Sequence, residues 1–366
     1  MAKGILVIGI TFCLVLQLAP IRAEDRGPTI SDSAFWRMIS TFSEESGTFR
    51  YENLLSNETS YQSVIPSLLK KVTRSRPLDM KRLHPTTVGA YIGVGPEQNF
   101  TYIAAIEPRI AFIVDIRRQN MLEHLVYKAL FESASRRPDF VSRLFSRRPA
   151  PELSGDISAG ELFKSYSAEK CDRQLMADTV DRVIDRLTGQ HGFPLDNPDR
   201  KIIRHVLEMF CAGGPQIDYG FVNAPSNLTA PSYAELMTAT DAQGRNWSYL
   251  ANDENFTRIR NMQLNNLIVP LVGDFGGEKT LKTVGQYLKR NGLAVTAFYV
   301  SNVEQYLNPD QTASFRSNVA SLPAAPSSTI IRFTPPESTT LDPIQNFVNP
   351  SLFHLLNSRP SSVWKE

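Results

Sequence analysis

The chain has 366 residues, of which 42% are hydrophobic and 21% are charged. This length and composition can bury a large core and predict one large or two small globular domains. The 39 basic and 37 acidic residues leave a formal net charge of +2. The balance excludes an overall electrostatic attraction to nucleic acid or to an anionic membrane as the main basis of function.

Residues 1–23 have the pattern of a signal peptide. Lys3 precedes an apolar run over 4–16, and a break at Pro20 leads to Ala23 at a cleavage position. The run is shorter than the ~20 residues that a membrane span needs. We therefore expect an exported protein, periplasmic or secreted, with no membrane span after the leader. An uncleaved N-terminal anchor is the alternative, because Ile21 is a poor residue for position −3 of the cleavage site.

An N-terminal helical region is expected over 24–86. Apolar residues recur at helical spacing over 30–41 and over 61–74. A basic, proline-containing stretch follows the second of these helices. We expect both helices to pack ahead of a sheet.

Strands and helices alternate from residue 87 onward. The β-rich run 87–94 contains Gly93, and Gly95 follows it before a segment able to form a helix. A second run, 111–116, precedes an amphipathic helix over 119–133. This alternation predicts an α/β fold with a Rossmann-like, doubly wound, mainly parallel sheet and helices on both faces.

A helical insertion is expected at about 136–260, with helical spacing clearest over 167–187 and 198–211. Five arginines open the insertion, and we interpret them as a solvated helix face that runs into a loop. They are Arg136, Arg137, Arg143, Arg147 and Arg148.

Two cysteines remain in the chain after the leader, Cys171 and Cys211. An even number could pair in an oxidising compartment. Each is also an ordinary residue for a buried position. The sequence leaves both possibilities open, because it does not fix the separation of the two Cα atoms.

The β pattern returns after the insertion and completes one Rossmann-like domain over 87–335. The later runs lie at 266–272, 294–300 and 328–333. A helix is predicted over 279–291. Residues 336–366 are rich in Pro, Ser and Thr and are expected to form a C-terminal tail.

Polar groups follow four of the predicted strands at the point where each strand ends. Ligands of such sheets bind outside these carboxyl ends, so we expect a small-molecule pocket there. The groups are Gly93, Gly95 and Glu97 after the first strand, Asp115 after the second, Asp274 after the third, and Asn302, Glu304 and Tyr306 after the fourth.

Each of these groups has a functional and a structural interpretation. Gly93 and Gly95 would allow close approach of a ligand, or would form an ordinary turn. Asp115 is placed to accept hydrogen bonds from a ribose diol, or it pairs with Arg117 or Arg118. Asp274 faces the pocket or caps a helix. The candidates for catalysis or for positioning an acceptor are Asp274, Asn302 and Tyr306.

Several motifs are absent from the sequence. There is no Gly-x-x-x-x-Gly-Lys-Ser/Thr loop, and Gln98 stands where G-x-G-x-x-G needs its third glycine, which disfavours ATP and standard NAD sites. No Gly-x-Ser-x-Gly motif occurs, and the five histidines lack metal-ligand spacing. We predict no metal site, and we expect His124 to be structural.

Two segments carry a resemblance to a known family. Residues 93–132, which begin GVGPEQNFTYIAA, and 266–307, which begin NLIVPLVGDFGGEK, cover about a quarter of the chain. They resemble the two signature blocks of an uncharacterised bacterial family typified by a Leptospira protein, with a fold like that of S-adenosylmethionine-dependent methyltransferases. The resemblance implies S-adenosylmethionine as a candidate cofactor. It implies a cofactor pocket at Gly93, Gly95, Glu97, Asp115 and Asp274.

Three hypotheses on function remain open. The first is a methyltransferase-type enzyme that binds S-adenosylmethionine or a related nucleoside. This cofactor is made in the cytosol, so an exported transferase would lack its methyl donor. The second is a non-catalytic envelope protein that uses the scaffold to bind another small molecule or a protein. The third is an exported hydrolase with Asp115 or Asp274 as general base. The sequence fixes neither the substrate nor the oligomeric state.

Overall fold

The computed structural model describes residues 28–74, 89–148, 157–221, 230–334 and 338–349. The predicted leader lies outside these residues, as does most of the predicted tail. Within the described part of the chain, no helix has the length and apolar character needed to cross a membrane.

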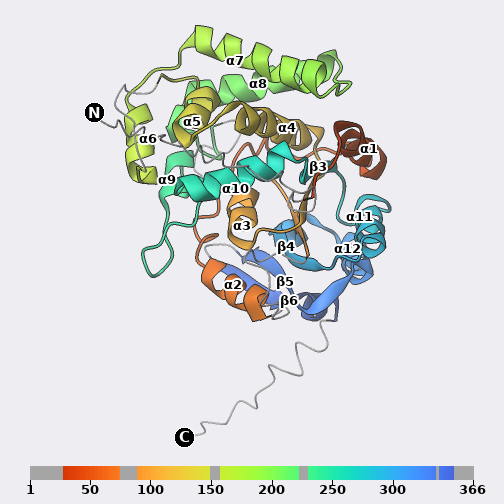
Figure 1. The fold of residues 1–366 in the computed structure, drawn as a ribbon. Coiled ribbons are helices and arrows are strands. Elements are labelled where there is room, and N and C mark those ends of the chain that lie inside the picture. The colour runs from red at the N-terminus through yellow and green to blue at the C-terminus, as the bar shows by residue number, and fades with distance from the viewer. Residues whose placement is uncertain (1–27, 75–88, 149–156, 222–229, 335–337, 350–366) are drawn as a thin grey trace, which may run out of the picture.

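A six-stranded sheet with the order β3-β2-β1-β4-β5-β6 forms the centre of the protein (Figure 1). The pairs from β3 to β5 are parallel, and β6 is antiparallel to β5. The strands are β1 (Ala90–Gly93), β2 (Ile110–Asp115), β3 (Ile268–Val272), β4 (Val295–Ser301), β5 (Ala324–Thr334) and β6 (Ser338–Pro343). This confirms the predicted Rossmann-like α/β fold. The strand order reverses between β1 and β4.

Helices cover both faces of this sheet, as the alternation predicted. Between β1 and β3 the chain forms α3, α4 and α10 among other elements, and α10 packs on both α3 and α4. Helices α11 and α12 follow β3 and β4 and pack together. The first of the N-terminal helices, α1, lies beside α11 and β3, and α2 packs on α3 and β5 (Figure 1). Their bounds are α1 (Asp32–Phe42), α2 (Ile65–Arg74), α3 (Gln98–Ile106), α4 (Arg118–Ser133), α10 (Asp253–Leu264), α11 (Thr280–Arg290) and α12 (Pro309–Ser321).

The burial of the central strands explains why the sequence pattern predicted them. Every residue of β1, β2 and β3 is buried, so each strand appears as an uninterrupted apolar run rather than an alternating one. Most of α4 is buried as well, because α5 (Arg137–Phe145), α8 (Asn197–Gly213) and α10 pack on it in addition to β2 and β3.

The helical insertion lies between α4 and α10, and its helices α7 and α8 are outermost at the top of Figure 1. The helices are α5 (Arg137–Phe145), α6 (Ala159–Ser167), α7 (Arg173–Asp185), α8 (Asn197–Gly213) and α9 (Tyr233–Thr238). The helix predicted over 167–187 is wrong at its start. Asp172 caps α7 instead, since its carboxylate accepts the N–H groups of Gln174 and Leu175 at 2.9 and 3.0 Å.

The interpretation of the arginine stretch as a solvated face is wrong for Arg137. This side chain is 1% exposed, although Arg136 nearby is solvated. The guanidinium of Arg137 donates to Asp253 at 2.6 Å and to the carbonyls of Leu250 and Ile157. It therefore ties α5 to α10, because a buried guanidinium requires this full set of acceptors.

The predicted tail is wrong over its first part. Strand β6 pairs with β5 from Ser338 to Pro343, and α13 (Ile344–Val348) buries Ile344 and Phe347 against the end of the sheet. Composition did not indicate this strand, because four of its six residues are Ser, Thr or Pro and its backbone supplies the pairing.

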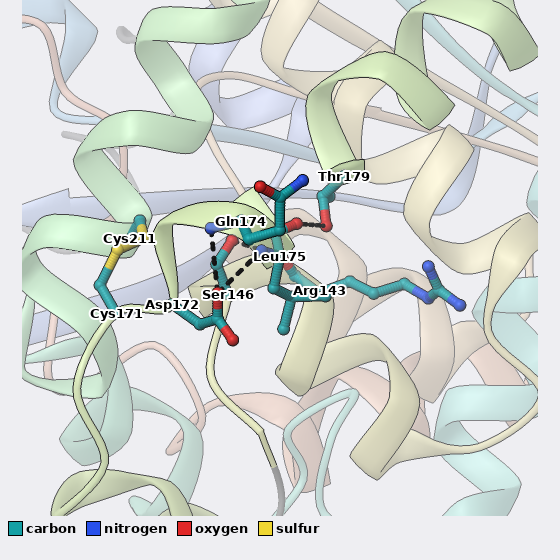
Figure 2. The surroundings of a disulfide bond; sticks show 8 residues. All are labelled: Arg143, Ser146, Cys171, Asp172, Gln174, Leu175, Thr179 and Cys211. Carbon is teal, nitrogen blue, oxygen red and sulfur yellow. Dashed lines mark hydrogen bonds between the residues drawn. A yellow bond between two sulfur atoms is a disulfide. The ribbon is translucent and has the colours of Figure 1, made fainter. Parts of the chain in front are cut away.

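A disulfide joins Cys171 to Cys211, with 5.2 Å between the two Cα atoms (Figure 2). Cys171 directly precedes the cap of α7, and Cys211 lies in the last turn of α8. The bond thus fixes the start of one outer helix against the end of its partner. The sequence had left open whether these two cysteines pair, and the structure shows that they do.

Removing this disulfide is expected to destabilise the insertion. For a sequence separation of 40 residues, the loss of loop closure corresponds to about 4 kcal/mol in the chain-entropy model. Cys171→Ser with Cys211→Ser should lower the free energy of unfolding in urea by about 2–4 kcal/mol. A reductant should lower the stability of the wild type and leave the double variant unchanged. A reductant effect of equal size in both proteins would contradict the role of the bond.

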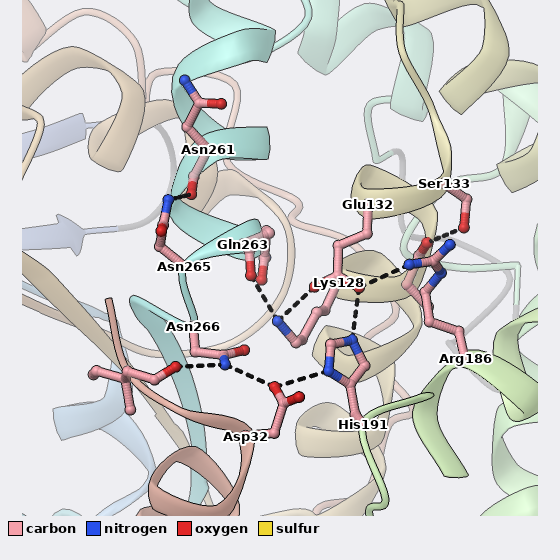
Figure 3. A network of polar contacts seen from close by, with 12 residues as sticks. Asp32, Lys128, Glu132, Ser133, Arg186, His191, Asn261, Gln263, Asn265 and Asn266 are labelled. Carbon is pink, nitrogen blue, oxygen red and sulfur yellow. Dashed lines mark hydrogen bonds and ion pairs between the residues drawn. The ribbon is translucent and has the colours of Figure 1, made fainter. Parts of the chain in front are cut away.

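A polar network joins α1, α4 and the connection between α7 and α8 (Figure 3). His191 lies between two carboxylates, with its Nδ1 at 2.9 Å from Asp32 and its Nε2 at 2.7 Å from Glu132. Lys128 pairs with Glu132 at 2.7 Å, and Asn266 donates to Asp32 at 2.9 Å. The network therefore attaches the first helix of the described chain to the central helix α4.

This network makes stability depend on pH. The hydrogen bond to Glu132 raises the pKa of His191 and outweighs burial, which lowers it. A raised pKa contributes stability that is complete below pH ~6.5 and is lost as the pH rises through the folded pKa. His191→Gln should therefore reduce the free energy of unfolding more at pH 5.5 than at pH 8.5, as measured by urea denaturation. A larger reduction at pH 8.5 would contradict the pairing.

Candidate functional site

A cavity of about 320 Å³ opens at the carboxyl ends of β1, β2, β3 and β4. Its volume falls within the range of small-molecule sites, and it lies at the strand-order reversal where ligands of doubly wound sheets bind. Five of the predicted site residues line it: Gly95, Asp115, Asp274, Asn302 and Tyr306. Gly93, Glu97 and Glu304 do not.

The segment between α1 and α2 forms a wall of the cavity that sequence analysis missed. Its backbone runs along the strand ends, since the N–H of Glu44 donates to Val272 and that of Gly47 to Ile116, each at 2.9 Å. The segment contributes six lining residues: Thr48, Phe49, Asn53, Ser56, Asn57 and Glu58. No period or motif marks this stretch, so its place could be found only from the fold.

Asp115 and Arg117 form a buried ion pair at the tip of β2. Oδ1 of Asp115 accepts the backbone N–H and the Nε–H of Arg117, and Oδ2 accepts from its terminal nitrogen, all at 2.9 Å. The remaining terminal nitrogen of Arg117 donates to the carbonyl of Glu52. The ion pair with Arg117, one of the two alternatives drawn from the sequence, is therefore present, and Asp115 also lines the cavity. A carboxylate can accept further hydrogen bonds beyond these three.

The turn after β1 is held from behind by Asn99. Its Nδ2 donates to the carbonyls of Val94 and Pro96 at 2.9 and 2.7 Å, and a Cβ on Gly93 would lie 1.9 Å from its Oδ1. Gly93 is thus needed for packing rather than for a ligand. Gly95 has φ +77°, and a Cβ there would meet nothing within 4 Å, so this glycine presents open backbone to the cavity.

His124 supports the same turn, since its Nε2 lies 2.9 Å from the carbonyl oxygen of Gly95. Burial lowers the pKa of His124 to about 4, so the ring is neutral at physiological pH. This agrees with the structural role expected from the sequence.

Asp274 does not cap the helix that follows it. Its Oδ1 accepts the N–H of Gly276 at 2.8 Å and so closes a turn at the rim of the cavity. The cap of α11 comes instead from Glu44, whose Oε1 accepts the N–H groups of Lys279 and Thr280 at 2.7 and 2.8 Å. Asp274 thereby keeps one carboxylate oxygen with no hydrogen bond among the described residues.

The end of β4 contributes a mixed polar and aromatic wall. Ser301 has φ +50°, a left-handed conformation that costs a non-glycine residue of order 1–3 kcal/mol. Asn302 and Tyr306 follow it, and the ring of Tyr306, which is 45% exposed, packs edge-on against Phe49 at 5.1 Å. Glu304 turns away from the cavity and pairs with Arg332 at 2.7 Å.

Glu58 is the lining residue with the most unusual environment. It is 1% exposed, and its Oε1 accepts the hydroxyl of Tyr299 at 2.6 Å and that of Ser301. Its Oε2 accepts the amide of Gln98 at 3.4 Å. Burial raises the pKa of Glu58 to about 7, against the lowering effect of these three hydrogen bonds. A carboxyl that titrates near neutral pH inside a cavity is a typical functional group.

Glu97 lies behind the cavity instead of lining it, which corrects its predicted place in the cofactor site. Its Oε1 accepts the N–H of Ser56 at 3.4 Å, and its Oε2 has no partner in the described structure. Burial raises its pKa to about 8. Glu123 on α4 is similar, since both of its oxygens lack a partner and burial raises its pKa well above the usual range. Burial therefore disfavours the ionised form of both side chains.

No metal site is formed among the residues that the structure describes, since no three His, Cys, Asp or Glu side chains converge there. The chemistry of the cavity instead comes from carboxyl groups, hydroxyl groups and aromatic rings.

The protonated state of Glu97 predicts a pH-dependent effect of its replacement. A carboxyl with a raised pKa stabilises the fold only while it stays protonated, so stability falls as the pH rises from ~4.5 to ~8. Glu97→Gln should match the wild type at pH 5 and exceed its free energy of unfolding at pH 8 by on the order of 4 kcal/mol. Thermal and urea unfolding at both pH values test this. A variant that is less stable at pH 8 would show that Glu97 is ionised.

The chain was compared with known proteins. No curated protein matches it. A family profile described as a domain of unknown function, DUF7790, matches residues 56–161 and 220–359. The two matched segments contain all six strands and leave out α7, α8 and the disulfide. The chain therefore belongs to the DUF7790 family of proteins of unknown function.

Proposed function

We propose that this protein binds a nucleoside-type small molecule of the S-adenosylmethionine class in the cavity and acts as a group transferase. The observation that carries the proposal is the position of Asp115. Its carboxylate lies at the tip of β2, beside the glycine turn of β1 and next to the strand-order reversal. In doubly wound sheets, an acidic side chain near this place accepts the hydroxyls of a ribose.

The charges of the lining favour a nucleoside over a nucleotide. Arg117 is the single Lys or Arg among the described lining residues, and each of its three guanidinium nitrogens already donates to Asp115 or to Glu52. Pro96 in the turn has no N–H to offer to a phosphate. The carboxyl of Glu58, which lines the cavity, also lies close to the start of α3. A phosphate would therefore meet an acidic group where phosphate-binding folds present free donors.

The acceptor of the transferred group would lie against the ends of β3 and β4. Asp274, Asn302 and Tyr306 line the cavity there, and Asp274 keeps a free carboxylate oxygen. Their role would be to hold the acceptor in line with the cofactor, which is the main contribution that a protein makes to such a transfer.

A second candidate function is supported by the disulfide and by the leader pattern. A Cys171–Cys211 bond is stable in an oxidising compartment such as the periplasm, where the cofactor of a methyltransferase is not supplied. In that setting, the protein would be a non-catalytic binding protein of the envelope, and the same cavity would hold a different small molecule. Native mass spectrometry of protein purified from its own envelope fraction separates the two candidates by the mass of the retained ligand.

Replacing Asp115 tests the ligand site. Asp115→Asn keeps the shape of the side chain but weakens the hydrogen bonds to a diol, so the Kd for S-adenosylmethionine or S-adenosylhomocysteine should rise about 10- to 100-fold in isothermal titration calorimetry. Asp115→Ala should abolish binding altogether.

The matched control is Asp139→Asn, which removes an ion-paired aspartate of α5 outside the cavity. It should leave the affinity unchanged. Thermal unfolding of each variant reports whether the loss of the buried pair with Arg117 has disturbed the fold. Unchanged affinity in a folded Asp115→Asn variant would contradict the assignment of Asp115 to the ligand site.

A further inference from the structure

We infer that the cavity selects a ligand that carries a positive charge, a sulfonium or an ammonium group, and that Glu58 is the residue that recognises it. The inference deepens the proposed function, since it takes the same cavity as the ligand site. It names the chemical class of the ligand and the residue that determines specificity.

The first support is the charge balance of the cavity. Its described lining holds three carboxyls, Glu58, Asp115 and Asp274, against one guanidinium. The guanidinium of Arg117 is already paired with Asp115. Glu58 and Asp274 form no ion pair in the described structure, so their charge is left for a ligand to compensate. A cation compensates it, whereas an anion adds to the repulsion.

The second support is the kind of groups around these carboxyls. Aromatic side chains line the cavity from several elements, among them Phe49, Tyr219, Phe275, Tyr299 and Tyr306. Ring faces attract desolvated organic cations, and a sulfonium or a substituted ammonium gains more from them than from water. The combination of rings with an unpaired carboxyl is therefore suited to an organic cation rather than to a hydrated metal ion.

The third support is the way in which Glu58 is held. The hydroxyls of Tyr299 and Ser301 both donate to Oε1, which leaves Oε2 with the single long contact from Gln98. Ser301 makes its contact from a left-handed backbone conformation. Strained residues persist where the surrounding structure fixes them and occur often at ligand sites. The carboxyl is thus positioned in advance, with one oxygen incompletely satisfied.

The groups packed around Glu58 do not neutralise it. Tyr299 comes from β4, Tyr91 from β1 and Tyr102 from α3, and burial raises the pKa of each phenol well above its usual value. Glu97 is linked to the same loop through the N–H of Ser56 and is kept protonated by burial. Ionisation of Glu58 therefore controls the local charge, and its pKa of about 7 places this change in an accessible range.

The test measures the preference for a cation as a function of pH. S-Adenosylmethionine and S-adenosylhomocysteine differ by the charged methylsulfonium group, so the ratio of their Kd values isolates recognition of the charge. For the wild type, calorimetric titrations at pH 6 and pH 8.5 should show the preference for S-adenosylmethionine rising up to about tenfold, as the ionised fraction of Glu58 rises. Trimethylsulfonium and its neutral analogue dimethyl sulfide provide a second pair of probes without the nucleoside.

Three variants keep the test specific. Glu58→Gln should remove the rise of the preference with pH. Asp274→Asn, which changes another carboxyl of the same cavity, should keep the rise. Ser301→Ala removes one donor that lowers the pKa of Glu58, so the midpoint of the rise should move to higher pH. This last variant keeps Glu58 itself and remains informative if Glu58→Gln does not fold.

The outcomes separate this inference from the proposed function. Binding of the nucleosides without any preference that depends on pH and on Glu58 would overturn the inference and leave the proposed function in place. Binding of trimethylsulfonium with that dependence, and of neither nucleoside, would support the inference and overturn the nucleoside. Failure of all four probes to bind would overturn both.

Discussion

The hydrogen bonds of the buried Glu58 carboxyl are the interaction on which the site depends. They join the loop before α2 to the start of α3 and to the end of β4, which are distant in the sequence. A carboxyl buried without these donors would cost several kcal/mol, so the three segments are stable only when they meet. Their meeting places an acidic group at the strand-order reversal. The ligand class that we propose follows from that placement.

The cavity is assembled from both halves of the chain because the N-terminal segment lies across the strand ends. Glu44 illustrates the constraint, since its carboxylate caps α11 and also accepts the N–H of Asp274. The rim at β3 is therefore held by a residue more than two hundred positions away. The network around His191 in turn fixes α1 against α4. It thereby holds the start of the N-terminal segment that follows α1. The same contacts therefore stabilise the fold and set the geometry of the site.

Much of the fold could be predicted from the sequence, because β1, β2 and β3 are continuous buried runs at whose ends glycine or polar residues stand. The strand pattern also predicted Asp115 and Asp274 as site residues, because parallel strands bring their carboxyl ends to one edge of the sheet. Glu58 could not be found in this way, because a single acid in an aperiodic loop carries no local signal. Glu97 was assigned wrongly because its sequence position in the turn does not reveal that its side chain points behind the cavity. The strand β6 was missed because pairing with β5 outweighs its polar composition.

The most direct test of the account is a crystal structure of the protein in complex with S-adenosylmethionine. We expect the ribose hydroxyls within hydrogen-bond distance of Asp115, the sulfonium on the side of Glu58, and no rearrangement of the Asp115–Arg117 pair. A ligand bound elsewhere on the protein, or an adenosyl group in the cavity with its sulfonium turned away from Glu58, would contradict the account.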